Sequence, residues 1–105
     1  MDKKLRGIEI LDKKTKIIYE RFDHSSIPFR LYHAHIDKKN LNHTIPVHYH
    51  SMLEVIMPPT GEIHIKINDQ VYPIYPGHIG IISPDIIHSI VFMDCDMVLK
   101  NTVFQ

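Results

Sequence analysis

The sequence predicts a small all-β domain. Eighteen isoleucines and six valines stand against a single alanine among the 105 residues. Side chains that branch at Cβ fit the pleated surface of a sheet, whereas alanine is the best helix former. Polar and apolar residues alternate along several segments, and turn-forming proline, glycine, asparagine and aspartate recur at short intervals. Short strands spaced in this way are typical of a β-sandwich or a β-barrel.

The expected strands and extended segments cover residues 7–18, 29–36, 44–50, 52–57, 63–67, 71–75, 78–83, 88–93 and 97–104. The clearest is 63–67, where isoleucines alternate with polar residues, so that one face is buried and the other is wet. Residues 37–43 (DKKNLNH) are polar and predict a loop, and Pro46 favours an extended chain before it. Turns are expected at residues 58–61, 68–69, 76–77 and 84–85 because of their composition.

Length and charge exclude some classes of function. A chain of 105 residues suits one domain, and twelve basic residues balance twelve acidic ones. Domains that bind nucleic acids usually carry a clear basic excess, so this chain is not expected to bind DNA by itself. The basic residues of the first forty positions are scattered and are interpreted as a solvated face.

Cysteine usage and hydropathy indicate the compartment. Cys95 is the only cysteine, which rules out an internal disulfide and favours a reducing environment. The N-terminal residues do not resemble a signal peptide, and no apolar run approaches the length that crosses a membrane. We therefore expect a cytoplasmic protein with no membrane partner.

The histidines are the most informative residues of the chain, which has nine of them. His48 and His50 lie two apart on an expected strand, so their side chains share one face with Cα atoms roughly 6.6 Å apart. Glu54 has the same parity, and His88 comes from a different strand. Neutral imidazoles together with a carboxylate suit a divalent transition metal such as Zn, Ni, Mn, Fe or Co, and the set does not choose among them.

A second His-x-His pair, His33 and His35, lacks a carboxylate a few residues further on. We interpret this pair as surface or partly buried histidines without a metal.

The spacing around the first pair resembles the first motif of the cupin family. That motif is a glycine, five residues, His-x-His, three or four residues, Glu, six residues and Gly. This chain matches it with His48, His50, Glu54 and Gly61, while Asn42 replaces the opening glycine.

The second cupin motif begins with a glycine and reaches a histidine eleven residues later, as Gly77 and His88 do. Three departures exist: Pro84 stands one position later than in the germin-like pattern, Asp85 replaces a glycine, and Phe92 replaces an asparagine. The resemblance implies that the chain is a single cupin-like domain over residues 1–105, with motifs at 48–61 and 77–88. A cupin is a double-stranded β-helix, a small jelly-roll-like barrel.

Within the cupins, the chain resembles the N-terminal ligand-sensing domain of AraC-type transcription regulators. The shared residues are Pro46, Val47, His48, Tyr49, His50, Leu53, Glu54, Val55, Ile56, Gly61, Ile63, Ile65, Asn68, Tyr72, Gly77, Ile79, Ile82, Pro84, His88 and Ser89. This resemblance implies a barrel that binds a sugar or another metabolite, and DNA contact only through a helix-turn-helix part that is not in this chain. The resemblance is also compatible with a homodimer.

Three hypotheses for the site follow. In a sensor, His48, His50, Glu54 and His88 line the effector pocket, around a metal or as bare hydrogen-bonding groups that suit hydroxyl-rich ligands. Tyr49, Tyr72 and Tyr75 could add aromatic walls, although such tyrosines more often serve ordinary packing of the barrel. In a small metal-dependent enzyme, a dioxygenase or isomerase, the same residues hold a redox metal. In the third hypothesis the four residues form a satisfied polar cluster without any ligand.

Overall fold

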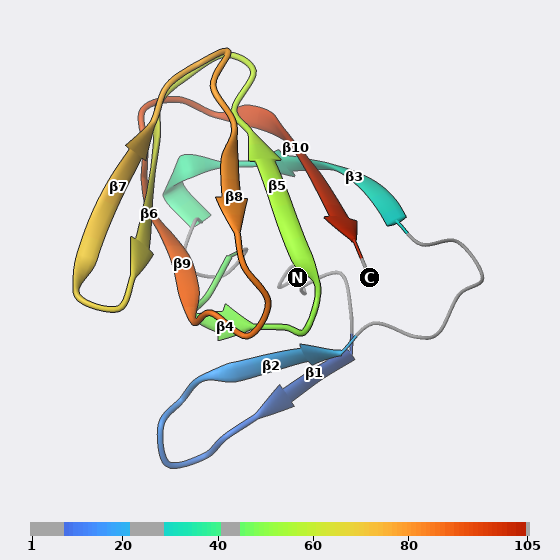
Figure 1. The fold of residues 1–105 in the computed structure, drawn as a ribbon. Coiled ribbons are helices and arrows are strands. Elements are labelled where there is room, and N and C mark those ends of the chain that lie inside the picture. The colour runs from blue at the N-terminus through green and yellow to red at the C-terminus, as the bar shows by residue number, and fades with distance from the viewer. Residues whose placement is uncertain (1–7, 22–28, 41–44, 105) are drawn as a thin grey trace.

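The computed structural model describes residues 8–21, 29–40 and 45–104, which form two β-sheets and contain no α-helix (Figure 1). Across the larger sheet the order is β1 (Ile8–Leu11), β2 (Ile18–Arg21), β4 (His48–Tyr49), β9 (His88–Met93), β6 (Ile63–Ile67) and β7 (Gln70–Ile74). Across the smaller sheet it is β3 (Phe29–Ile36), β10 (Met97–Phe104), β5 (Leu53–Met57) and β8 (Gly80–Ile82). The predicted all-β class is confirmed.

The hydrophobic core lies between the two sheets. Its buried members come from strands of both: Ile36, Ile56, Ile63, Ile65, Ile74, Ile82, Ile90, Met93, Met97 and Leu99. The predicted alternation holds in β6, where Ile63 and Ile65 are buried and Lys66 is exposed. One face of β6 therefore packs inward, as period-two patterning requires.

The chain crosses between the sheets several times, and two of these crossings carry the histidine motifs. It passes from β4 in the larger sheet to β5 in the smaller one, and later from β8 in the smaller sheet to β9 in the larger one. All strand pairs are antiparallel except β2 with β4, which are parallel. In this strand order neither sheet closes on itself, and β7 and β8 are edge strands.

Some expected strands are shorter in the structure. The extended segment expected over residues 44–50 contains only the two-residue strand β4, and the one expected over residues 78–83 contains only β8. In the expected loop, Lys38–Asn40 form a 3-10 turn, and the Asp37 carboxylate accepts a hydrogen bond from the Lys39 N–H at 2.9 Å. An aspartate that bonds the backbone two residues on is a common turn device. Residues 41–44 lie outside the described residues.

Two glycines shape the turns that flank the core strands. A Cβ on Gly61 would lie 2.1 Å from Asp94 Oδ1 and 2.6 Å from Cys95 Sγ, so any larger residue in the turn before β6 would displace these two side chains. Asp94 occupies this place because its carboxylate accepts a hydrogen bond from the Glu62 N–H at 3.0 Å. Gly77 has a φ of 82°, in the left-handed region that glycine enters without steric cost.

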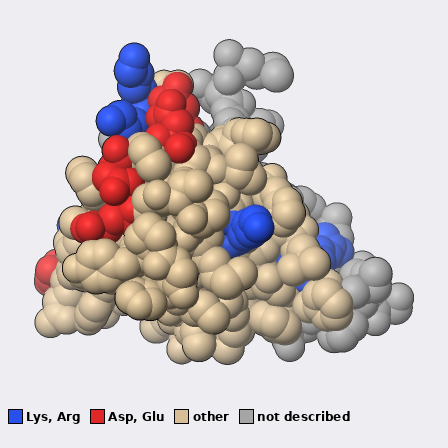
Figure 2. All heavy atoms as spheres, turned by 90° about the horizontal axis from the view of Figure 1, so that it is seen from above, with Lys and Arg blue, Asp and Glu red and all other residues tan. Residues whose placement is uncertain are grey.

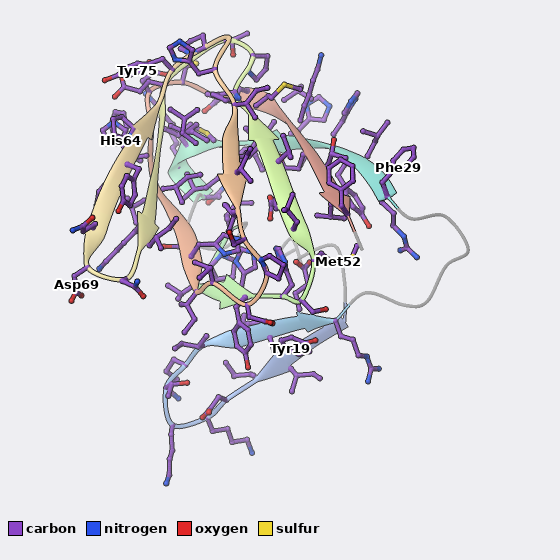
Figure 3. The ribbon with its side chains drawn as sticks, in the orientation of Figure 1. Tyr19, Phe29, Met52, His64, Asp69 and Tyr75 are labelled. Carbon is purple, nitrogen blue, oxygen red and sulfur yellow. The ribbon has the colours of Figure 1, made fainter. Side chains whose placement is uncertain are left out.

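On the face seen from above most of the area is uncharged; acidic side chains gather on one side, and basic side chains lie beside them and at separate places elsewhere (Figure 2). Several large apolar side chains are exposed around β7 and β8: Val71, Tyr72, Tyr75, Ile79 and Ile81. Asp69 and Tyr75 flank β7, one just before the strand and the other just after it (Figure 3).

Candidate metal centre

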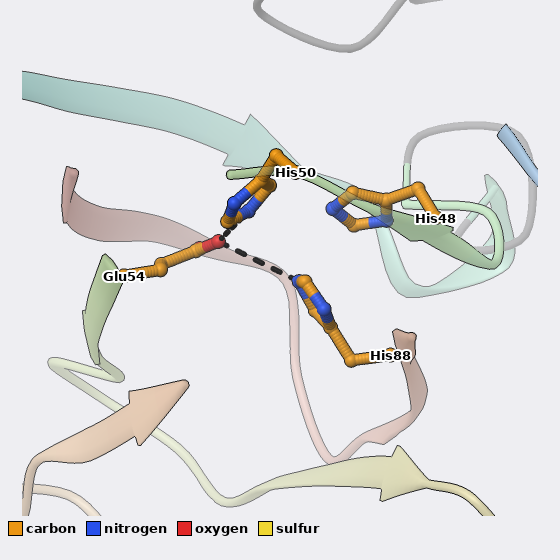
Figure 4. A group of neighbouring side chains, drawn as sticks. All are labelled: His48, His50, Glu54 and His88. Atoms are coloured by element: carbon orange, nitrogen blue, oxygen red, sulfur yellow. Dashed lines mark hydrogen bonds and ion pairs between the residues drawn. The ribbon is translucent and has the colours of Figure 1, made fainter. Parts of the chain in front are cut away.

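The four residues of the predicted site lie together between the two sheets. His48 in β4 and His88, the first residue of β9, are cross-strand partners, and His50 follows directly after β4. Glu54 reaches the group from β5 of the opposite sheet (Figure 4). The backbone N–H of Asp85 donates to the His50 carbonyl oxygen at 2.7 Å, which ties the loop before β9 to the His50 segment.

Their ligating atoms converge. One nitrogen from each imidazole and a Glu54 oxygen all lie within 4.8 Å of one another. His50 Nε2 is 2.9 Å from Glu54 Oε1, and His88 Nε2 is 3.6 Å from the same oxygen. The His48 and His88 rings pack against each other, with centroids 4.3 Å apart. This is the set that the sequence predicted, brought together by three strands.

Backbone hydrogen bonds orient all three rings. Each Nδ1 contacts a main-chain carbonyl oxygen two residues away: His48 with Pro46 at 2.7 Å, His50 with Met52 at 2.9 Å and His88 with Ile86 at 2.7 Å. A carbonyl oxygen only accepts, so each Nδ1 carries the hydrogen. In a neutral ring the other nitrogen, Nε2, then has a lone pair, and these lone pairs face the centre of the cluster.

The inward atoms are deeply buried and incompletely satisfied. The exposed fractions of His48, His50, Glu54 and His88 are 2%, 1%, 3% and 4%. Among the described residues, neither His48 Nε2 nor His88 Nε2 has a hydrogen-bond partner. A buried polar atom without a partner costs about 1–3 kcal/mol. A divalent transition metal would satisfy both lone pairs, so the residues fit such an ion.

Burial controls the protonation of His48. Desolvation, followed by the nearby His88, lowers the pKa of His48 from 6.5 to about 3. His48 is therefore neutral at physiological pH, the state in which an imidazole binds a metal.

Asn101 is a member of the site that the sequence analysis missed. Its side-chain nitrogen donates to Glu54 Oε2 at 2.5 Å, which leaves Oε1 directed at the histidines. Outer hydrogen bonds of this kind orient metal-binding carboxylates. A signal existed in β10, where residues 97, 99, 101 and 103 are the buried positions and only Asn101 among them is polar.

The other candidate residues lie elsewhere. Tyr49 packs on Tyr19 of β2, with ring centroids 5.0 Å apart, and faces away from its neighbour His48. Tyr72 is half-exposed on β7, where its hydroxyl donates to Gln70 at 2.5 Å. His33 and His35 are exposed on β3, as predicted for the second His-x-His pair.

Comparisons with known proteins identify no relative: no family model, curated protein or solved structure matches the chain significantly. In the part of the chain that the structure describes, no helix is long and apolar enough to span a membrane.

Proposed function

We propose that this chain is a cupin-fold domain that binds one divalent transition-metal ion and presents it to a small molecule. His48, His50, Glu54 and His88 are the ligands, and the metal is Zn, Ni, Mn, Fe or Co. One observation carries the proposal: three buried imidazoles, each with its Nδ1 hydrogen bonded to a carbonyl, direct Nε2 toward a single carboxylate oxygen.

Backbone conformations at the motif positions support the cupin fold. Gly77, the first residue of the second motif, has a φ of 82°. Asp85, which replaces a glycine of the pattern, has a φ of 65°, in the region where glycine is usual and aspartate is tolerated. The two sheets, with His48 and His88 paired on adjacent strands of the larger one, are compatible with a small jelly-roll-like barrel.

The residues of the chain would hold the ion and control its surroundings. The three imidazoles supply neutral nitrogen donors, and Asn101 holds the Glu54 carboxylate in place. The shell of buried side chains excludes bulk water and so strengthens electrostatic interactions at the centre. A metal held by four protein ligands can keep open coordination positions, where it orients and polarises an oxygen-bearing molecule.

The role that the resemblance supports is small-molecule sensing in an AraC-type transcription regulator. In that role the bound effector biases an attached DNA-binding part outside this chain, in the cytoplasm, and a homodimer is compatible with it. The chain itself then needs no basic surface, which agrees with its balanced charge.

A second candidate is a small metal-dependent enzyme, a dioxygenase or isomerase. The enzyme hypothesis is favoured by the intact four-residue set, in which every candidate ligand also makes a hydrogen bond to a backbone carbonyl or to Asn101. Supporting hydrogen bonds of this kind tune both the affinity of a metal and its reactivity.

The test is metal content after purification and dialysis against Zn, Ni, Mn, Fe and Co in turn. The wild type should retain about one ion per chain. A double variant, His48→Ala with His50→Ala, should retain none, while His33→Ala with His35→Ala serves as a matched His-x-His control and should bind like the wild type. Equal retention by all three proteins, or by none, would overturn the proposal and favour a plain polar cluster.

A further inference from the structure

A groove of about 290 Å³ opens between the edge strands of the two sheets. It is lined by Ile65, Ile67, Tyr72, Ile74, Gly80, Ile81 and Ile82. The β6–β7 hairpin forms one wall and β8 the other, at the side of the molecule where these elements face each other (Figure 1). The groove exists because β7 ends the larger sheet, β8 ends the smaller one, and neither strand pairs with the other.

The lining is almost entirely hydrocarbon. Five of the seven lining residues are isoleucine, one is glycine, and none is charged. The single polar side chain is that of Tyr72, whose hydroxyl already donates to Gln70. A sugar placed here would leave several hydroxyl groups without partners, at a cost of about 1–3 kcal/mol each. The groove therefore suits an aliphatic group rather than a hydroxyl-rich one.

The groove adjoins the candidate metal centre through two strand pairs. Ile67 in its wall is the cross-strand partner of His88, and Ile82 in the opposite wall is the partner of Glu54. Residues directly opposite in neighbouring strands point to the same face, with Cβ atoms about 4.5–5.5 Å apart. Each wall of the groove thus has one isoleucine beside a candidate metal ligand: Ile67 beside His88, and Ile82 beside Glu54.

We propose that the groove binds the apolar body of a small oxyacid whose carboxylate or similar oxygen-bearing head binds the metal ion. The inference rests on the proposed function and names its ligand class: an aliphatic acid rather than a sugar. A volume near 290 Å³ equals that of roughly ten water molecules, which fits a short acyl chain.

The experiment uses the whole chain loaded with Co(II), whose visible absorption changes when a ligand binds. The probes are acetohydroxamate and hexanohydroxamate, which share one metal-binding head and differ by four methylenes. Burial of each methylene should tighten binding by about fourfold, so the longer probe should bind by about two orders of magnitude more tightly.

Two tyrosine variants locate the effect. Tyr72 and Tyr75 are exposed to 46% and 47%, but only Tyr72 lines the groove. Tyr72→Glu should reduce the preference for the longer probe at least tenfold, because a charge then borders the apolar lining. Tyr75→Glu, at the other end of β7 from Asp69 (Figure 3), should keep the wild-type preference.

The outcomes separate the two proposals. If the wild type takes up no Co(II), the metal centre fails and this inference fails with it. If Co(II) binds but the two probes have equal affinity for the wild type, the inference alone is overturned and the metal centre stands. An equal loss of preference in both tyrosine variants would also place the apolar contact outside the groove.

Discussion

His50 and Glu54 face each other with two atoms that would both accept a hydrogen bond in their common charge states. His50 Nε2 lies 2.9 Å from Glu54 Oε1, while His50 Nδ1 bonds the Met52 carbonyl, also at 2.9 Å. A separation of 2.9 Å is that of a hydrogen bond, so a cation, either a proton or a metal ion, must lie between the two atoms. In the metal-free protein it is a proton, and in the proposed holoprotein it is the metal ion.

Metal should therefore stabilise the folded chain strongly. At a free metal concentration one hundred times the Kd, the gain is about 2.7 kcal/mol, which corresponds to an increase in Tm of about 10–20 °C for a domain of this size. Thermal melts with and without each ion measure it. His88→Ala should abolish the shift, and an equal increase in that variant would show that the ion binds elsewhere.

Glu54→Gln should separate metal binding from folding. The glutamine amide nitrogen can donate to His50 Nε2, and its oxygen can accept from Asn101, so the metal-free variant should lie within about 1 kcal/mol of the wild type. Its metal affinity should fall by more than 100-fold, because a charged ligand is lost.

Glu54→Leu is the contrasting variant, because it removes both hydrogen bonds and leaves buried polar atoms unpaired. It should be destabilised by about 1–3 kcal/mol for each atom left without a partner. Urea denaturation of the metal-free proteins gives both free energies of unfolding, and equal values for the two variants would contradict the proposed hydrogen-bond network.

Asn101→Ala should weaken metal binding without removing a ligand. Loss of an outer hydrogen bond to a ligating carboxylate typically lowers metal affinity by about 10–100-fold. Thr102→Ala is the matched control, because the neighbouring residue of β10 has the opposite parity. Calorimetric titration supplies both Kd values, and similar values for the two variants would remove Asn101 from the site.

Acid should destabilise the metal-free protein through His48. The pKa of this residue is lowered from 6.5 to about 3 in the folded state. The contribution of His48 to the free energy of unfolding is complete above pH 6.5, because its imidazole is then neutral in both the folded and the unfolded chain. It is lost as the pH falls toward 3, since only the unfolded chain takes up the proton.

Because one proton is taken up on unfolding, the free energy of unfolding should fall by at most about 1.4 kcal/mol per pH unit. Chemical denaturation at a series of pH values from 7.5 to 4 gives the profile, and His48→Asn should make it shallower. A profile that this variant leaves unchanged would mean that His48 titrates normally in the folded protein.

Most of the local structure could be predicted from the sequence. Alternation in 63–67 and the polar loop before Pro46 are local signals; the first appears in β6, and of the second the described residues 37–40 lie outside the strands. Strand lengths were overestimated where backbone pairing ends early: β4 stops at Tyr49, so His50 lies in the following loop although it keeps the expected side.

By itself, the sequence determined the strand class, the buried face of residues 63–67 and the residue types that could bind a metal, because side-chain parity is a property of a few adjacent residues. Only the tertiary structure decided that His88 pairs with His48, that Glu54 approaches from the other sheet and that Asn101 holds it. It also placed Ile67 and Ile82 beside the centre. These contacts depend on hydrogen-bond ladders between strands that are distant in the chain, and no local pattern encodes which strands will pair.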